Sequence, residues 1–345
     1  MPQTEIVDMR KELQARNFSV LSRKLRQALV NAAAEGEQAI VLLNRRGYST
    51  FVLCRDCGES VMCPHCAVAM VYHSADNILR CHYCGNQLPV PDNCPVCGSK
   101  KIRYLGTGTQ KAEEEIMALP EVRVLRMDQD STVAKFAHAD ILHKFLLGER
   151  NVLIGTQMVA KGHDIPNVTL VGVLLADSSL NMPDYKASER TFSLLTQAAG
   201  RAGRGNKEGH VIFQAYDAEN EIISLAARQD YDTFARKELH DREELLYPPF
   251  VQMLKITVWD EDMERGLTLA KQAVNFLQSK ILDDTLKDTF ILGPFPAIVA
   301  KVRDMYRFHI IIKAKDIQPV KDLLLSSEFK EQKNLYFDVD PLSVI

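Results

Sequence analysis

The sequence lacks any long apolar run and has almost no excess charge of either sign. Its 345 residues carry 42 Lys and Arg against 45 Asp and Glu, a formal net charge of −3. Without an apolar stretch of about 18 residues, no membrane-spanning helix is predicted. Without a basic excess, any surface that attracts nucleic acid has to be local. The N-terminal segment has no signal-peptide pattern, and we therefore expect a cytoplasmic protein that does not contact membranes.

No cysteine lies outside a C-x-x-C pair. All eight cysteines fall between residues 54 and 97, as CRDC, CPHC, CHYC and CPVC. A reducing compartment disfavours disulfides. Thiolates separated by two residues can both bind one ion, and two such pairs complete a closed tetrahedral zinc site. We therefore predict two structural Zn²⁺ ions in an inserted Cys-rich module at 54–97, in preference to iron–sulfur clusters or disulfides.

The gaps between successive pairs are 5, 14 and 9 residues, and they favour a nested arrangement of the two sites. A cross-braced pairing remains an alternative. We interpret His65, His73 and His82 as bystanders rather than ligands. In the nested arrangement the outer site is Cys54, Cys57, Cys94 and Cys97, and the inner site is Cys63, Cys66, Cys81 and Cys84.

Around the cysteines, continuous apolar runs alternate with helical patterns, which is typical of an α/β domain with a parallel sheet covered on both faces. We predict helices at 19–36, 109–119, 139–149 and 187–201. We predict strands at 38–44, 49–53, 101–106, 122–128, 151–156, 169–177 and 209–216.

The alternation of apolar strands and helices ends after residue 216. A charged helical linker is expected at 218–246, and YPPF at 247–250 breaks the chain. Strand and helix patterns then predict a small α+β domain at 247–345, with a strand or loop at 288–300 and a strand at 308–314.

The stretch TQAAGRAGRG holds two arginines among three glycines. Gln197, Gly200, Arg201 and Arg204 have the spacing of one helical face. Gly200 and Gly203 each cost a helix about 1 kcal/mol relative to Ala, which suggests that a ligand approaches closely. Arginine suits a phosphoryl group. The alternative is a solvated helix end with two surface arginines.

Two polar loops follow predicted strands. Thr156, Gln157, Lys161, Gly162 and Asp164 crowd the first, at the carboxyl edge of a parallel sheet, where such folds bind ligands. The second, LGTGTQK at 105–111, is Gly-rich and precedes a helix, as phosphate-binding loops do. It lacks the G-x-x-x-x-G-K-[ST] spacing and could equally be a plain turn.

These motifs together resemble a known family. GTQMVAKGHD followed by QAAGRAGR resembles motifs V and VI of superfamily 2 helicases. With the four C-x-x-C pairs, NRRGY (44–48), YLGTGTQ (104–110) and GPFPAIVAKVRDMYRFHIIIKA (293–314), the chain is similar to the replication-restart helicases of the PriA family. The resemblance implies a RecA-like helicase lobe 2 at 1–53 and 98–217, followed by the linker and a C-terminal DNA- or partner-binding domain.

The resemblance implies part of an ATP-dependent 3′→5′ DNA helicase that binds stalled forks and D-loops, with motifs IV–VI in this chain. It implies binding to forked and single-stranded DNA, single-strand-binding protein and helicase-loading proteins of the primosome, and a monomer. By the same resemblance, the zinc module takes the nested pairing and contributes to strand separation rather than hydrolysis.

Residue roles follow from the same resemblance. The residues expected to face ATP are Gln197, Arg201 and Arg204, and those expected to bind nucleotide or couple it to DNA are Gly162, Asp164 and Gly200. Thr109 and Thr156 are expected on the DNA backbone. Arg303, Tyr306 and Arg307 form a possible stacking platform for DNA, against the alternative of an ordinary amphipathic strand.

The chain departs from the family in lacking the P-loop lysine and the Mg²⁺-binding acidic motif of a first lobe. The acidic run 260–262 lies in the wrong domain. ATP and Mg²⁺ are therefore expected as cofactors of the complete enzyme, and this chain alone is expected to bind ATP weakly and hydrolyse none. The alternative function is a non-catalytic, zinc-dependent DNA-binding and interaction module in primosome assembly.

Overall fold

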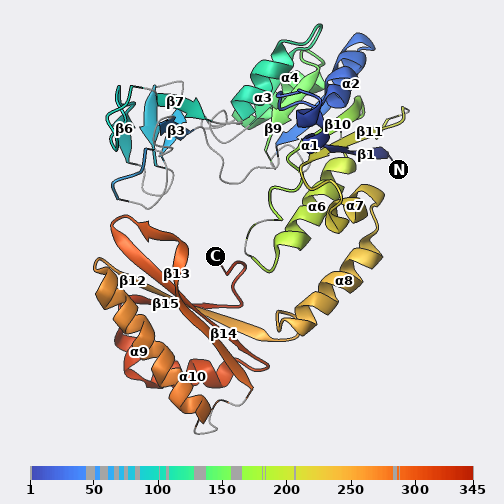
Figure 1. Ribbon diagram of the computed structural model, residues 1–345. Helices are drawn as coiled ribbons and strands as arrows, with labels where there is room; N and C mark the ends of the chain where they lie inside the picture. Colours follow the sequence, from blue (N-terminus) through green and yellow to red (C-terminus); the bar gives the residue numbers. More distant parts are fainter. Residues whose placement is uncertain are drawn as a thin grey trace. The chain divides into compact units, whose positions relative to one another are not determined.

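The chain divides into two compact units, Met1–Ser49 with Gly106–Lys237 and Thr50–Leu105 with Glu238–Ile345 (Figure 1). Within the described residues no helix is long and apolar enough to cross a membrane. The computed structural model describes residues 2–43, 51–54, 61–65, 70–73, 77–81, 86–100, 102–105, 109–127, 137–156, 165–180, 182, 184–205, 207–282, 286 and 288–344.

The first unit is built on a six-stranded sheet in which every neighbouring pair is parallel. Its strands read as continuous buried runs, as a sheet covered on both faces requires. In spatial order they are β1 (Gln3–Asp8), β11 (His210–Ala215), β10 (Val168–Leu174), β2 (Gln38–Leu43), β9 (Val152–Gly155) and β8 (Val124–Met127).

Helices cover both faces of this sheet, because alternate residues of β2 point to opposite sides. Val41 joins one core with Leu25 of α2 and Ile116 of α3, and Leu42 joins the other with Phe145 of α4. The parallel α/β prediction is confirmed. The helices of this unit are α1 (Met9–Gln14), α2 (Arg23–Ala34), α3 (Thr109–Met117), α4 (Ala137–Leu146), α6 (Ala187–Ala199) and α7 (Glu221–Arg228).

Two features of the first unit differ from the sequence patterns. No strand was predicted at residues 3–8, yet β1 pairs with β11 along the edge of the sheet. Part of the expected linker, 218–246, also packs into the first unit, because Ile223 of α7 and Phe234 of α8 (Tyr231–Glu244) are buried in its core. The chain passes from one unit to the other within α8.

The Cys-rich module has its own antiparallel sheet, in the order β6 (Gln87–Pro89), β5 (Ile78–Arg80), β4 (Val71–His73), β3 (Phe51–Cys54) and β7 (Ile102–Leu105). The predicted strands at 49–53 and 101–106 therefore pair with each other, Phe51 opposite Leu105 and Cys54 opposite Ile102. They close the base of the module and do not join the parallel sheet.

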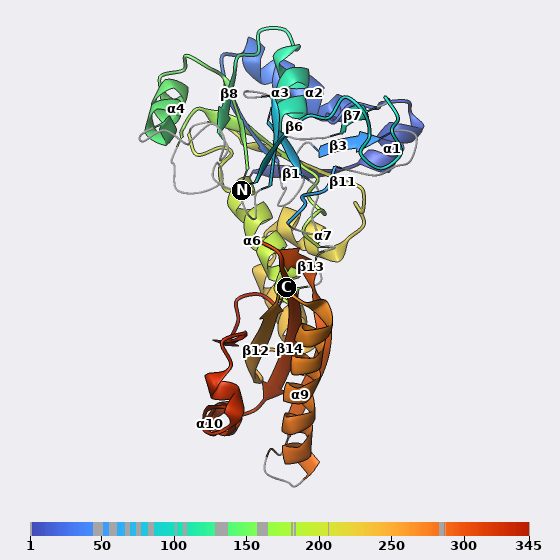
Figure 2. The same cartoon turned by 90° about the vertical axis from the view of Figure 1, so that its left-hand side faces the viewer.

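The C-terminal part of the second unit is an α+β domain, as predicted. An antiparallel sheet in the order β13, β14, β12, β15 carries α9 and α10 on one face, where Ile256 and Ile310 are buried with Ala273 and Leu324 (Figure 2). Its elements are β12 (Gln252–Asp260), α9 (Met263–Leu282), β13 (Thr289–Val302), β14 (Met305–Ala314), α10 (Gln318–Ser326), the 3₁₀ turn Glu328–Glu331 and β15 (Leu335–Val339).

Candidate functional site

The motif that resembles helicase motif VI lies where α6 ends. The helix stops at Ala199 with Gly200 as its C-cap, and two tighter hydrogen bonds continue the turn to Ala202. Gly203 then takes a φ of 71°, in the left-handed region that ends helices. The prediction of one helical face across 197–204 is therefore wrong at Arg204, which lies beyond this break.

The glycines of this segment are explained by backbone packing. The Gly203 N–H donates to Val168 O at 2.9 Å. A Cβ at Gly203 would lie 2.5 Å from Gly209 N, and one at Gly205 would lie 2.6 Å from Pro166 O. A Cβ at Gly200 would meet nothing closer than 3.4 Å. The close approach inferred from Gly200 and Gly203 therefore has an intramolecular cause at Gly203, and Gly205 is packed against backbone in the same way.

The polar side chains of the segment differ in exposure. Gln197 and Arg204 are exposed, and Arg201 is half-buried. The Arg204 Nε donates to the Gly200 carbonyl at 2.8 Å. A cation at this position also complements the helix dipole, so Arg204 caps α6 in the structure.

The motif that resembles helicase motif V starts at the carboxyl end of β9. Thr156 is half-buried directly after that strand, and Gly162 and Asp164 lie outside the described residues. The chain is described again from Ile165, which is buried. The contacts of Gly203 with Val168 and of Gly205 with Pro166 thus bring motif VI against the segment that leaves motif V.

Two buried carboxylates, missed in the sequence analysis, bind backbone and side-chain donors in the segments after β11 and before α6. Asp177 accepts hydrogen bonds from the backbone N–H groups of Tyr216 and Asp217, at 2.9 and 2.8 Å. Asp184 accepts from the Lys186 N–H at 2.9 Å and from Arg190 Nη1 at 3.2 Å, just before α6. The one sequence signal was an acid directly after a buried run, in LLAD at 174–177.

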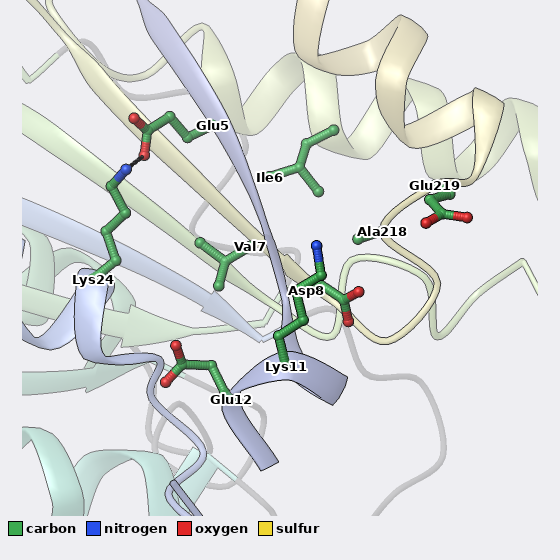
Figure 3. Close-up of a pocket in the computed structure, with 9 residues that line it drawn as sticks. All are labelled: Glu5, Ile6, Val7, Asp8, Lys11, Glu12, Lys24, Ala218 and Glu219. Carbon is green, nitrogen blue, oxygen red and sulfur yellow. Dashed lines mark ion pairs between the residues drawn. The ribbon is translucent and has the colours of Figure 1, made fainter. Parts of the chain in front are cut away.

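A separate cavity of about 530 Å³ opens beside β1 and α1 (Figure 3). Glu5 and Lys24 form an ion pair on its wall, and Asp8 also lines it. The Arg10 side chain, hydrogen-bonded to Asp8, holds the pKa of that carboxyl below its usual value. None of the predicted site residues lines this cavity.

Thr109 is the first residue of α3, consistent with a loop that opens a helix. Apart from Thr156, which follows β9, the other predicted DNA contacts lie at the end of the β13–β14 hairpin. Arg303 is in its turn, and Lys301 Nζ lies 5.3 Å from the centre of the Tyr306 ring. The Arg307 guanidinium donates to Val299 O, at 3.0 Å from Nε, and lies over Trp259. Arg307 is thus engaged within its own domain.

The cysteines of the module are described in part. Cys63, Cys81 and Cys94 are buried and Cys97 is exposed. Of Cys54 only the backbone is described, and Cys57, Cys66 and Cys84 lie outside the described residues. Two side chains of each predicted set are therefore visible, and the described residues alone bring no three ligands together.

The visible turns fit a metal-binding role. The Val96 N–H points at Cys94 Sγ at 3.4 Å, and the chain closes through Gly98 N to Cys94 O at 2.9 Å, with Gly98 at a φ of 74°. An amide aimed at sulfur favours the thiolate that zinc requires. The Cys81 N–H donates to Asn86 O at 2.8 Å, so the two ends of the segment that contains the third C-x-x-C pair lie close together.

Three protein families match successive parts of the chain. Residues 98–206 match the helicase conserved C-terminal domain, residues 63–89 the PriA DNA helicase Cys-rich region, and residues 243–342 the primosomal protein N C-terminal domain. The match to the Cys-rich region supports zinc as a ligand of this module.

Curated relatives cover nearly the whole chain. It is 45% identical to replication restart protein PriA of Bacillus subtilis over 99% of its length, and 40% identical to PriA of Synechocystis over 100%. It spans 42% of each relative. Among solved structures, the Pyrococcus furiosus Hef helicase domain is 16% identical, covering 60% of this chain and 28% of that one, with a TM-score of 0.29. A TM-score this low adds nothing to the assignment.

The match to the helicase conserved C-terminal domain, at 98–206, covers much of the parallel lobe. The Cys-rich module and the C-terminal domain that accompany it are those of one helicase family. Along nearly its whole length the chain is similar to the PriA family of replication restart proteins, and its Cys-rich and C-terminal domains match the models of that family.

Proposed function

We propose that this chain supplies the second lobe of an ATP-dependent 3′→5′ DNA helicase that acts at stalled forks and D-loops and restarts replication by primosome assembly. The observation that carries the proposal is a contact between the two motif segments. Gly203 and Gly205 of motif VI pack against Val168 and Pro166, which follow motif V in the chain. In this function Arg201, Arg204 and Gln197 face ATP. Nucleotide binding and coupling fall to Gly162, Asp164 and Gly200, and DNA phosphate contacts to Thr109 and Thr156.

ATP hydrolysis needs groups that this sequence does not contain. No G-x-x-x-x-G-K-[ST] run occurs in it, and that loop normally cradles the phosphates and helps to hold Mg²⁺. Arg204 would leave the Gly200 carbonyl to meet a γ-phosphate, where an arginine stabilises the charge of phosphoryl transfer. The chain alone would therefore bind ATP weakly and hydrolyse none.

For the Cys-rich module we propose two structural zinc sites with the nested pairing. Cys63 and Cys81 lie in one apolar cluster that does not include Cys94, which favours placing the first two in the same site. Zinc would act there as a folding staple, with all four positions taken by protein. The inner set is Cys63, Cys66, Cys81 and Cys84, and the outer set is Cys54, Cys57, Cys94 and Cys97.

The domains that go with this function were predicted at 1–53 and 98–217 for the lobe, 54–97 for the zinc module, 218–246 for the linker and 247–345 for the C-terminal domain. We propose that 50–53 and 98–105 belong with the zinc module and 218–237 with the lobe, in line with the two compact units. The C-terminal domain would help to bind forked and single-stranded DNA, through Arg303, Tyr306 and Arg307. Single-strand-binding protein and helicase-loading proteins are the proposed partners, and the proposed state is a monomer in the cytoplasm.

The test is Arg204→Ala in a full-length helicase that contains this chain. Loss of the arginine should abolish unwinding while fork binding persists, because binding rests on other contacts. Arg228→Ala is the matched control, since Arg228 is an exposed arginine of the same unit at the end of α7. Unchanged unwinding by the Arg204 variant would refute the motor role.

The second candidate is a non-catalytic, zinc-dependent DNA-binding and interaction module in primosome assembly. The missing phosphate-binding loop favours it. ATP hydrolysis by the purified chain, with and without forked DNA, separates this candidate from a chain with a hidden nucleotide site. ATP turnover stimulated by DNA would contradict both candidates, the helicase lobe with an incomplete ATP site and the non-catalytic binding module.

A further inference from the structure

The end of the β13–β14 hairpin is a two-residue turn without glycine. Val302 pairs with Met305, and the residues between them, Arg303 and Asp304, have φ values of 51° and 64°. Such a turn matches the twist of the strands but needs left-handed residues, for which glycine, asparagine or aspartate is normal. Arginine is rare in this region because its Cβ lies too close to the following carbonyl oxygen, and such conformations persist where the surroundings hold them.

The turn is held by the Cys-rich module of the same unit. The Asp304 N–H donates to His65 O at 2.9 Å, and the Asp304 carboxylate lies 2.6 Å from His65 Nδ1. Lys301 Nζ lies 3.3 Å from the other oxygen of that carboxylate. His65 stands in the CPHC run, between the proposed inner zinc ligands Cys63 and Cys66.

An apolar contact lies beside this polar one. Val302 is only 7% exposed because it packs in one cluster with Val61, Cys63, Met70, Leu79 and Cys81. Val299 and Trp259 of the C-terminal domain border the same cluster. Arg307 joins these two, since it donates to Val299 O and lies 5.2 Å from the centre of the Trp259 ring.

The module side of this contact is built from short strands. Among the described residues β4, β5 and β6 contain three residues each, at the short end of the range for globular proteins. In small metal-binding folds, metal binding contributes the folding free energy. The two cysteines of the cluster, Cys63 and Cys81, are proposed ligands of the inner site, so loss of that ion would remove the surface on which Val302 rests.

We propose that zinc at the inner site controls the docking of the β13–β14 hairpin on the Cys-rich module, so that the C-terminal domain responds to the zinc state of a segment more than 200 residues earlier in the chain. The inference rests on the proposed zinc site. Arg307 acts in it as a positioning residue, which holds Val299 and Trp259 against the module.

The chain contains a single tryptophan, and Trp259 borders the contact. Its fluorescence therefore reports docking directly. In the zinc-loaded chain, removal of zinc with a chelator should move the Trp259 emission to longer wavelength and increase its quenching by acrylamide. Amide hydrogen exchange at 299–307 should increase at the same time, while α9 stays protected. Zinc content is measured on the same samples.

Variants separate docking from zinc binding. Val302→Asp should still bind both zinc ions. With zinc bound, its Trp259 emission should equal that of the unmodified chain after zinc removal, and the chelator should no longer change it. Val339→Asp, an exposed valine of the same domain, is the matched control and should behave as the unmodified chain. Asp304→Asn should raise amide exchange at 299–307 by about 1.4- to 5-fold, as expected for an exposed ion pair, and the exposed Asp338→Asn should not.

The outcomes are distinguishable. If zinc binds and is then removed while the Trp259 fluorescence and the amide exchange at 299–307 stay unchanged, the coupling is refuted and the zinc site is retained. If the chain holds no zinc, the zinc site and the coupling fail together. If Val302→Asp leaves Trp259 and its response to the chelator unaltered, with α9 still protected, the docking contact is refuted.

Discussion

Gly205 meets the carbonyl oxygen of Pro166 so closely that a side chain has no room. A Cβ there would lie 2.6 Å from that oxygen, whereas one at Gly200 would lie 3.4 Å from its nearest neighbour. Neither glycine has a left-handed φ, so the two positions differ in space rather than in backbone strain. Two glycines of one motif therefore serve different purposes.

We predict that Gly205→Ala lowers the free energy of unfolding by about 1–3 kcal/mol, because the added methyl group overpacks against backbone. Gly200→Ala is the matched control and should change it by less than about 1 kcal/mol, since its contact is near van der Waals distance. Urea denaturation of the purified chain measures both. Equal effects of the two substitutions would contradict the packing explanation.

His309 in β14 is 4% exposed. Burial, with the charges of Lys255 and Arg307, lowers its pKa from 6.5 to about 4. Between these values the unfolded chain binds a proton that the folded chain does not, so stability is fully present above pH 6.5 and is lost as the pH falls toward 4.

We therefore predict that the free energy of unfolding decreases more steeply between pH 7 and pH 5 in the unmodified chain than in His309→Phe. Comparison of the two pH profiles, from urea titrations at each pH, cancels the contribution of other groups. Parallel profiles would show that His309 does not titrate differently in the folded state.

At the scale of elements, β10 and β11 are held together at their carboxyl ends by a side chain. The Asp177 carboxylate accepts hydrogen bonds from the backbone N–H groups of Tyr216 and Asp217, which follow β11. It is 7% exposed, so these donors would otherwise be poorly solvated. The same sheet edge leads from β11 to α7, whose Asn220 caps the helix by accepting from the Ile222 N–H.

We predict that Asp177→Ala destabilises the chain by about 1–3 kcal/mol, because buried amides lose their acceptor. Asp177→Asn keeps one acceptor oxygen and should cost less. Urea denaturation gives both values. An alanine variant as stable as the asparagine variant would mean that solvent replaces the carboxylate at this edge.

At the scale of the whole molecule, the chain combines units stabilised in different ways. The parallel sheet has apolar cores on both faces, and none of the cysteines whose side chains are described belongs to either. The Cys-rich module has a small apolar cluster that includes two cysteines. Metal removal should therefore affect the two units unequally.

We predict two zinc ions per chain, and we expect chelation to raise amide exchange in β4 and β5 while β2 and β10 stay protected. Elemental analysis and hydrogen exchange measured by mass spectrometry test the two statements. One ion per chain would refute the second site. Equal loss of protection in β2 would mean that the parallel sheet also depends on zinc.

We also predict no ATP hydrolysis by the purified chain, with or without forked DNA, at full zinc occupancy. The reason is the absent phosphate-binding loop. A coupled assay of released phosphate measures turnover, and fluorescence anisotropy of labelled fork DNA verifies that the same sample binds DNA. Turnover stimulated by DNA would show a complete nucleotide site within these residues.

Much of this architecture could be predicted from sequence, because it depends on short-range patterns. Apolar runs such as 38–44 and 169–177 identify buried strands, and C-x-x-C spacing identifies metal-binding turns. The candidate site was located by motif, but its geometry was not. A regular helical spacing across 197–204 could not reveal the left-handed residue at Gly203.

The sequence by itself determined the α/β class, the zinc chemistry and the α+β C-terminal domain, since periodicity and ligand spacing are properties of neighbouring residues. Only the tertiary structure decided the pairing of β1 with β11, the pairing of β3 with β7, the seat of Gly205 on Pro166 and the contact of Asp304 with His65. Each of these joins residues far apart in the chain, and such partners are selected by how surfaces pack together rather than by local pattern.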